Sequence, residues 1–264
     1  MSTFTRCTRD GDTVHKQLAP AAVFAAFTDA LCRDGLPAIT GYLATLRAAG
    51  VRLPDRLELV DGANTAEGRP ARLGVRHRWI DGRLLPEIIT TDPARAVTAI
   101  RTVLGWLTAL ENTDARIDTN LANFCLPDDG APVLIDLLPP LIPSARPAAR
   151  TPFETLFDAL CFDTTLTRAA MLGYAARALL QAGHTAAAAN VLRLAPATAG
   201  TAFPAAWFGA RLTLARAATE DRVPLQAMLQ LFERTSVLAL SRLRPGEQRR
   251  RVHDTQAAVE ACAA

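Results

Sequence analysis

The alternation of apolar and polar residues near the start of the chain predicts a β-hairpin. Alternating segments over residues 3–9 and 13–18 flank the sequence Asp10-Gly11-Asp12. An Asp-Gly pair between two alternating segments is typical of a tight hairpin turn. Because side chains alternate along a strand, three residues of the second strand share one face of the predicted sheet: Val14, Lys16 and Leu18.

Helical periodicity follows the hairpin. It extends over residues 20–33 and again over residues 37–49. Four apolar residues occupy one side of the first predicted helix: Val23, Phe24, Phe27 and Leu31. Short apolar segments over residues 56–61 and 71–80 are predicted strands.

A longer helix is predicted to begin at Asp92-Pro93, which supply an N-cap and a first-turn proline. Its apolar stripe should pack in a core and consists of Val97, Ile100, Val103, Leu104 and Leu107. From about residue 153 onward the pattern predicts helices alone. Strands therefore come first and helices follow, which predicts an α+β fold in two lobes.

Composition and charge narrow the class of protein. Half of the residues are hydrophobic, which suffices for a sizeable core, and the net charge at neutral pH is only +3. The one dense basic run, Arg249-Arg250-Arg251, has no aromatic RNA-binding motif beside it, so we expect no nucleic-acid partner. No apolar run approaches about eighteen residues, and the N-terminal residues lack the apolar middle of a signal peptide. We therefore expect a cytoplasmic protein without a membrane partner.

Cysteine and histidine give no sign of a zinc site. The five cysteines include no CxxC pair, and the histidines are scattered without an HExxH motif: His15, His77, His184 and His253. We expect reduced thiols, and histidines that are either hydrogen-bonded in the fold or exposed at the surface.

Lysine is almost absent from the chain. Of the 29 lysine and arginine residues, Lys16 is the only lysine. A compact ammonium and a planar guanidinium differ in shape and hydrogen-bond geometry, so Lys16 marks a position where the two are not interchangeable. Two alternatives stay open: the lysine survived by chance, or it is a core residue whose ammonium reaches toward solvent.

The candidate chemistry lies in residues 117–136. Asn123 follows Asp118 by five residues, and Asp136 follows Asn123 by thirteen, at the end of an apolar segment. A turn sequence over residues 127–130 predicts that Asn123 and Asp136 lie on neighbouring strands of one hairpin. Phosphoryl transfer from a nucleotide needs a carboxylate that orients the attacking hydroxyl and oxygen ligands that hold Mg²⁺ against the phosphates. A D-x-x-x-x-N loop followed by a strand-ending Asp supplies both.

In these residues the chain resembles the aminoglycoside phosphotransferase and protein-kinase-like superfamily. The segment from Trp79 to Leu85 looks like the hinge between the two lobes of that family, and Lys16 lies on a strand where the family has its phosphate-binding lysine. The resemblance implies a two-lobed kinase-like α+β fold with a shortened N-lobe. A small antiparallel-sheet N-lobe would span residues 1–80, and a mainly helical C-lobe would span residues 81–264.

The resemblance also implies roles. Asp118 would be the catalytic base, and Asn123 and Asp136 would hold Mg²⁺. Four residues would bind the phosphate donor, ATP or GTP: Lys16 at the α- and β-phosphates, and the backbone of Trp79, Ile80 and Asp81 at the base.

Several positions depart from the family pattern. Arg116 replaces the usual histidine before Asp118, and Leu137-Leu138 follows Asp136 where a Phe-Gly pair is common. The helix over residues 37–49 carries no acid that could pair with Lys16. Too few residues precede Lys16 for a full glycine-rich loop between two strands.

The resemblance implies a phosphotransferase that moves the γ-phosphate of ATP or GTP to a hydroxyl. The acceptor would be a small molecule, aminoglycoside-like or another natural product, or a peptide. The alternative is a catalytically impaired pseudokinase that serves as a binding or scaffold module for a partner enzyme. A third hypothesis is an interaction protein whose helices after about residue 153 carry the function. Asp158 and Asp163 would bind a cationic acceptor or are ordinary polar positions of a helix.

Overall fold

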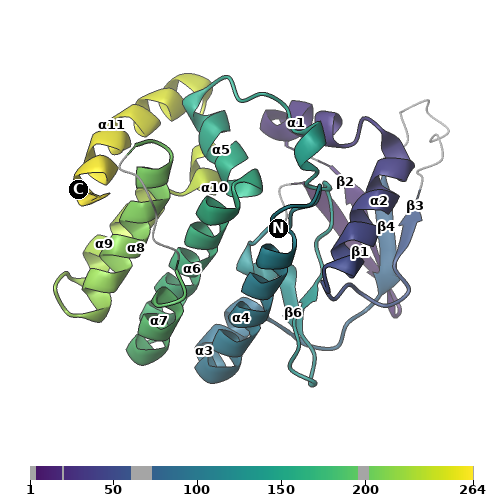
Figure 1. The fold of residues 1–264 in the computed structure, drawn as a ribbon, viewed down its shortest axis with the longest axis horizontal. Coiled ribbons are helices and arrows are strands. Elements are labelled where there is room, and N and C mark those ends of the chain that lie inside the picture. The colour runs from purple at the N-terminus through teal and green to yellow at the C-terminus, as the bar shows by residue number, and fades with distance from the viewer. Residues whose placement is uncertain (1–3, 20, 61–72, 196–201, 264) are drawn as a thin grey trace. The chain divides into compact units, whose positions relative to one another are not determined.

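The structure is a computed structural model and describes residues 4–19, 21–60, 73–195 and 202–263. It confirms the α+β prediction, with two small antiparallel sheets and a long series of helices (Figure 1). The chain forms two compact units. The first comprises Met1–Leu84, Gly105–Asp118 and Asn123–Pro147, and the second comprises Leu85–Leu104, Thr119–Ala122 and Ala148–Ala264. The predicted boundary at residue 80 stays a prediction.

The first unit contains a four-stranded antiparallel sheet in the order β1-β2-β4-β3. Its strands are β1 (Thr5–Asp10), β2 (Thr13–Leu18), β3 (Glu58–Val60) and β4 (Gly74–Arg78). The predicted hairpin is therefore confirmed, with Gly11 and Asp12 as its turn. Gly11 has φ +57°, in the left-handed region that glycine enters without a steric cost. The later strands are shorter than predicted, and residues 61, 71 and 72 of those predictions lie outside the described residues.

The helices that lie wholly within the first unit include η1 (Ala22–Phe24), α1 (Ala25–Leu31), α2 (Gly35–Ala48) and η3 (Pro143–Ala145). The single helix predicted over residues 20–33 thus begins as a 3₁₀ turn, and its residue 20 lies outside the described residues. Phe24 and Leu31 are buried as predicted, whereas Val23 is 48% exposed. The prediction for Val23 is wrong because a 3₁₀ turn has three residues per turn, which moves Val23 away from the apolar side of α1.

A second antiparallel sheet in the first unit has the order β5-β6-β7. Its strands are β5 (Arg83–Leu84), β6 (Phe124–Leu126) and β7 (Val133–Leu134), with Leu84 opposite Cys125 and Phe124 opposite Leu134. Gly82 lies against β6 so closely that an added Cβ atom would meet a backbone carbonyl oxygen at 2.7 Å. Only glycine allows the chain to enter β5 along this path.

One face of the larger sheet is buried against the segment that follows β7. Leu18 of β2, Val75 of β4 and Leu138 form a buried apolar cluster. Val14 and Lys16 share this buried face with Leu18, as the alternation of the sequence predicts. The segment that carries Asp136 therefore runs close to the face that carries Lys16.

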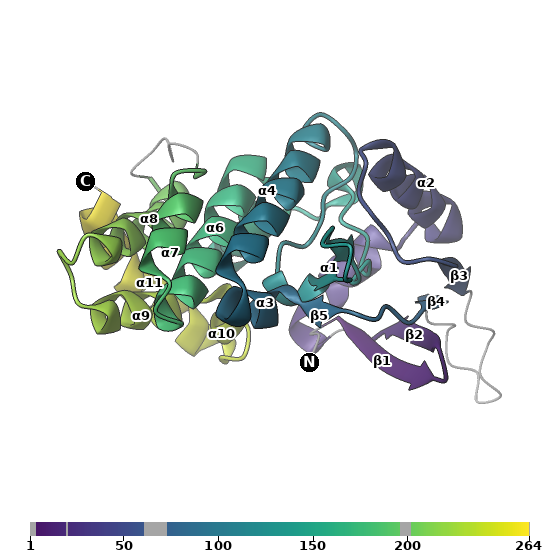
Figure 2. The same cartoon turned by 90° about the horizontal axis from the view of Figure 1, so that it is seen from below.

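The second unit is helical in its described residues. It contains α3 (Leu85–Thr91) and most of α4 (Pro93–Ala109), whose last residues from Gly105 belong to the first unit, and η2 (Leu121–Asn123) is divided between the units at Asn123. Its further helices are α5 (Pro152–Phe162), α6 (Thr164–Gln181), α7 (Thr185–Leu192), α8 (Ala205–Thr219), α9 (Leu225–Arg234), α10 (Val237–Leu240) and α11 (Pro245–Ala263). Figure 2 shows α6, α7 and α8 side by side. The prediction of helices alone after residue 153 is confirmed for the described residues. None of the helices in the described ranges has the length and apolarity that a membrane crossing requires.

Capping side chains define three helix starts of this unit, and the sequence predicts the one at Asp92. Asp92 precedes α4 and accepts a hydrogen bond from the Arg95 amide at 3.0 Å. Thr151 and Glu154 form a capping box at the start of α5. Asp163 accepts from the Leu166 amide at 3.0 Å and caps α6. The carboxylate of Asp163 therefore has a structural task, which supports the simpler of its two interpretations.

Candidate active site

Arg116 holds together the turn that follows α4 and leads to Asp118. One guanidinium nitrogen donates to the carbonyl oxygens of Leu110 at 2.7 Å, Thr113 at 2.9 Å and Ala115 at 2.7 Å. The other terminal nitrogen donates to the backbone carbonyl oxygen of Glu111 at 2.8 Å. Carbonyl groups at the end of a helix lack partners within the helix and attract cations. Arginine suits this position because its fork presents several donors at once. Burial lowers the pKa of the Arg116 guanidinium.

Asp118 and Asn123 lie at the two ends of this loop. The Asp118 side chain is exposed, whereas Asn123 is buried. The Asn123 side-chain amide donates to the backbone oxygen of Asp118 across 3.5 Å, at the long limit of a hydrogen bond. The loop therefore presents the carboxylate of Asp118 to solvent and turns Asn123 inward.

The β6–β7 hairpin brings Asn123 close to Asp136. Asn123 directly precedes β6, and its backbone oxygen accepts from the Ile135 amide at 2.9 Å. The two site residues thus flank the hairpin, although the prediction put them within its strands. That detail is wrong because β6 and β7 pair over very few residues before the backbone turns away.

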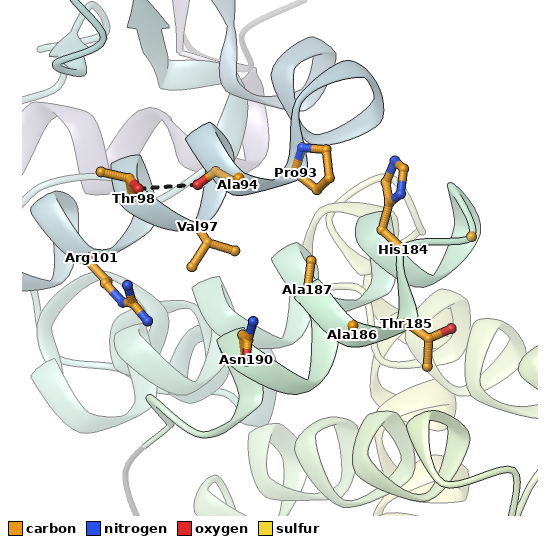
Figure 3. A pocket seen from close by; sticks show the side chains of 11 residues that line it. Pro93, Ala94, Val97, Thr98, Arg101, His184, Thr185, Ala186, Ala187 and Asn190 are labelled. Carbon is orange, nitrogen blue, oxygen red and sulfur yellow. Dashed lines mark hydrogen bonds between the residues drawn. The ribbon is translucent and has the colours of Figure 1, made fainter.

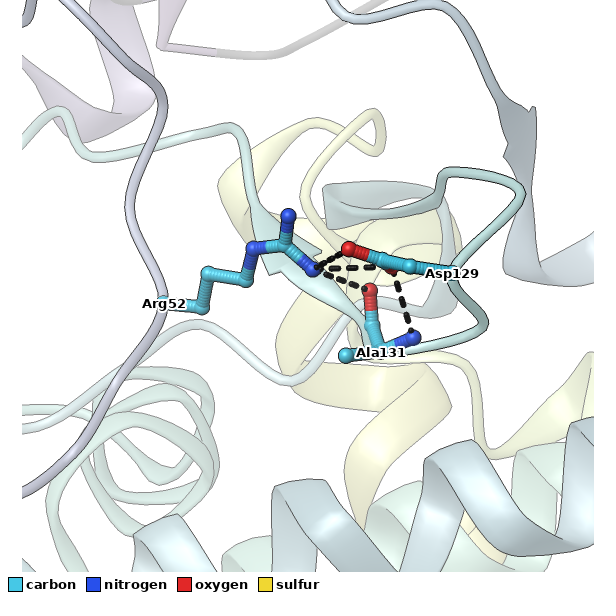
Figure 4. A network of polar contacts seen from close by, with 3 residues as sticks. All are labelled: Arg52, Asp129 and Ala131. Carbon is cyan, nitrogen blue, oxygen red and sulfur yellow. Dashed lines mark hydrogen bonds and ion pairs between the residues drawn. The ribbon is translucent and has the colours of Figure 1, made fainter.

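An ion pair at the turn anchors this hairpin. Arg52 contacts both carboxylate oxygens of Asp129, at 2.6 and 2.9 Å, beside Ala131 (Figure 4). The backbone oxygen of Arg52 also accepts from the Leu134 amide at 2.9 Å. The loop after α2 therefore holds both the turn and β7, although an exposed ion pair adds at most about 1 kcal/mol.

Lys16 and Asp136 meet on the buried face of the larger sheet. The ammonium nitrogen of Lys16 lies 3.7 Å from Oδ1 of Asp136 and donates a hydrogen bond to the backbone oxygen of Ile135. The side chains are only 9% and 14% exposed. Oδ1 of Asp136 is buried and has no hydrogen-bond partner in the described residues. The fold thus brings the only lysine to the carboxylate that follows β7.

His77 lies on the same sheet face and corrects a prediction. It faces Val14 in the β2–β4 register and is 4% exposed. Its Nδ1 atom lies 2.8 Å from the Arg78 backbone oxygen, so Nδ1 carries the proton and Nε2 presents a lone pair. Nε2 is buried without a partner in the described residues, so His77 is neither fully hydrogen-bonded nor exposed. Burial lowers the pKa of His77, and the Lys16 charge lowers it further.

Tyr42 of α2 is a second residue that the sequence did not single out. It is 4% exposed, and its hydroxyl donates to the Arg116 backbone oxygen at 2.9 Å. Burial raises the pKa of Tyr42, and the negative charges of Asp118 and Asp136 raise it further. The position of Tyr42 among the apolar residues of α2 indicates a core residue and no contact with the Asp118 loop. The contact with the loop depends on long-range packing.

The segment predicted to bind the base follows β4, and part of its backbone makes no hydrogen bond within the described residues. The Trp79 amide donates to the backbone oxygen of Asp12 at 2.6 Å, and the indole N–H donates to the carboxylate of Asp81 at 3.0 Å. The Arg9 guanidinium lies 3.9 Å from the centre of the Trp79 ring. The backbone of Ile80 makes no hydrogen bond to any residue that the structure describes. Its amide and carbonyl therefore have capacity for a ligand.

The donor set around Asp136 fits a hard cation. The buried carboxylate oxygen of Asp136, which accepts no hydrogen bond from the described residues, and the side-chain amide of Asn123 are ligands that Mg²⁺ accepts. Within the described ranges, no three His, Cys, Asp or Glu side chains form a group that could hold a metal by themselves. A cation here would need oxygen ligands from a second molecule, as Mg²⁺ takes from nucleotide phosphates.

The second unit has an open groove between α4 and α7. Its cavity measures about 640 Å³ and is lined mainly by small apolar side chains, with Val97 facing Ala187 and with Arg101, His184 and Asn190 beside them (Figure 3). None of the residues with predicted roles lines it. No buried, unpartnered polar atom of the described residues belongs to its lining. The groove therefore gives no indication of chemistry.

Comparison with known proteins adds no relative. No protein-family model matches the chain, and no curated protein matches its sequence. The chemistry of the first unit therefore carries the functional conclusion.

Proposed function

We propose that the chain is a kinase-like phosphotransferase that moves the γ-phosphate of ATP or GTP to a hydroxyl group. The observation that supports this most is the approach of Lys16 to Asp136, 3.7 Å apart on the buried sheet face. The two residues are far apart in the sequence, on β2 and after β7. In kinases a strand lysine contacts the nucleotide phosphates, and an Asp after a strand holds Mg²⁺ beside it.

Each residue has a distinct role in the proposed reaction. The exposed carboxylate of Asp118 accepts the proton of the acceptor hydroxyl. The acceptor oxygen bonds to the γ-phosphorus while the bond from that phosphorus to the β–γ bridging oxygen breaks, and the nucleoside diphosphate leaves. Lys16 neutralises charge on the α- and β-phosphates.

Two further groups position the donor. The backbone of Trp79, Ile80 and Asp81 holds the base, and the open amide and carbonyl of Ile80 suit that role. Asn123 and Asp136 would hold Mg²⁺, which supplies charge neutralisation at the phosphates when bound. The finer fold, a two-lobed kinase-like arrangement, belongs to the same proposal.

A pseudokinase is the second candidate, and one observation favours it. The turn between β1 and β2 consists of Gly11 and Asp12 alone, so no glycine-rich loop extends over the phosphates from this hairpin. Such a protein would bind a nucleotide or a partner enzyme without turnover.

Nucleotide binding and transfer separate the candidates. Thermal melting with Mg²⁺ and ATP or GTP should stabilise the wild type, and Asp136→Ala should remove the Mg²⁺-dependent part. Incubation with γ-labelled nucleotide and a panel of aminoglycosides, other hydroxylated natural products and peptides should label an acceptor. Asp118→Asn should abolish that transfer and keep binding. Binding without transfer to any acceptor would support the pseudokinase, and absence of nucleotide binding would contradict the phosphotransferase.

A further inference from the structure

The Lys16 ammonium lies beside the carboxylate that is proposed to hold the metal ion, and the inference drawn from this position rests on the proposed function. The ammonium group donates to the Ile135 oxygen and lies 3.7 Å from Oδ1 of Asp136. Helix α2 carries no Asp or Glu that could hold the ammonium elsewhere. Among the described residues, Asp136 is the carboxylate that pairs with Lys16.

The Asp136 carboxylate in turn depends on the Lys16 ammonium. Oδ1 of Asp136 is buried and accepts no hydrogen bond from the described residues. A buried carboxylate without a compensating charge is strongly unfavourable, so the Lys16 ammonium serves as its counter-ion. The same oxygen is the atom that a divalent cation would bind. One position next to Asp136 thus suits two cations that repel each other.

The side chain of His77 supplies a further hydrogen-bond acceptor in the surroundings of Lys16. Its Nε2 lone pair is buried without a partner, and the Lys16 charge contributes to the lowering of its pKa. The ammonium has three hydrogen-bond donors and uses one on Ile135. The surroundings of Lys16 are therefore rich in acceptors, which favours retention of the ammonium in the ligand-free protein.

We propose that Lys16 occupies the Asp136 carboxylate as an internal counter-ion and excludes a divalent cation until nucleotide phosphates draw the ammonium away. The site then fills in an order. Phosphates bind first or together with the metal ion, because they offer Lys16 a new anionic partner and release Asp136. The metal ion alone binds weakly because it must displace a cation from a buried pair.

Binding of Mn²⁺ alone tests this, with Mn²⁺ as a spectroscopic substitute for Mg²⁺. Titrations followed by electron paramagnetic resonance compare the wild type with Lys16→Met, in which the competing charge is absent. The variant should bind Mn²⁺ at least about tenfold more tightly than the wild type, and Lys16→Met with Asp136→Asn should lose that gain. Lys16→Arg keeps the charge and should bind no more tightly than the wild type. Gln17→Met, on the exposed face of the same strand, is the matched control and should not change binding.

Equal Mn²⁺ affinity of wild type and Lys16→Met would overturn the proposal, and so would a gain in Lys16→Met that survives loss of Asp136. Melting curves verify that each variant is folded, and Lys16→Gln replaces Lys16→Met if the latter is not. Adding a non-hydrolysable ATP analogue to the wild type should raise Mn²⁺ affinity. Failure of the analogue to bind would contradict the proposed function but not the competition between Lys16 and the metal ion, which the nucleotide-free titrations measure separately.

Discussion

Acid should weaken the fold through His77. Burial lowers the pKa of this histidine and the Lys16 ammonium lowers it further, whereas the Arg78 carbonyl and the Asp136 carboxylate act in the opposite direction. The fold therefore holds His77 neutral, and the unfolded chain binds the proton more readily. Stability is complete above the unfolded pKa of about 6.5 and decreases as the pH falls below it. The decrease levels off below the folded pKa.

The size of the effect is bounded by one proton. A single group changes the free energy of unfolding by at most about 1.4 kcal/mol per pH unit. A decrease from about pH 7.5 to about pH 5.5 therefore costs up to about 1.4 kcal/mol through His77. The full amount requires that the imidazole stays neutral in the fold, which its 4% exposure and the adjacent Lys16 favour.

Urea unfolding at the two pH values measures this. The wild type should lose stability on acidification, and His77→Gln should lose less because an amide does not titrate. His253→Gln is the control, since the His253 side chain is 89% exposed, and it should follow the wild type. If His77→Gln and the wild type lose the same free energy, His77 does not carry the acid sensitivity and the reasoning is wrong.

Three further changes test the packing around the site by urea or thermal unfolding. Tyr42→Phe removes a buried hydrogen bond to Arg116 and should cost about 1–2 kcal/mol, and no loss would contradict the anchoring of the loop by α2. Gly82→Ala should cost more than about 1 kcal/mol because the new methyl group would meet a backbone oxygen at 2.7 Å. The control is Gly105→Ala in α4, where the added methyl group has open space, and it should stabilise the fold by about 0.5–1 kcal/mol. Arg52→Ala should cost less than about 1 kcal/mol despite the short contacts, because the pair is exposed, and a larger loss would show that the hairpin turn depends on it.

Local signals in the sequence predicted several of the elements. The Asp-Gly turn gave the β1–β2 hairpin, and alternation put Lys16 on the buried face. Asp92 gave the start of α4. In contrast, α3 was missed, because seven residues are too few for periodicity to emerge and Pro86 in its first turn obscures the pattern.

The missed parts of the candidate site depend on contacts between distant segments. His77 joins the site through the pairing of β4 with β2, and no local pattern of a short strand specifies its partner. Tyr42 reaches the loop through the placement of α2, which the helix periodicity alone leaves open. The spacing of Asp118, Asn123 and Asp136 was visible because all three lie within one short stretch of sequence.

The guanidinium of Arg116 makes the loop of Asp118 depend on the turn that follows α4. It binds four carbonyl oxygens of residues 110–115, so the loop and this turn should open together as one cooperative unit. Amide hydrogens from Leu110 to Asp118 should then exchange with solvent at similar rates. The Arg116 side chain thereby sets how long the carboxylate of Asp118 stays in place.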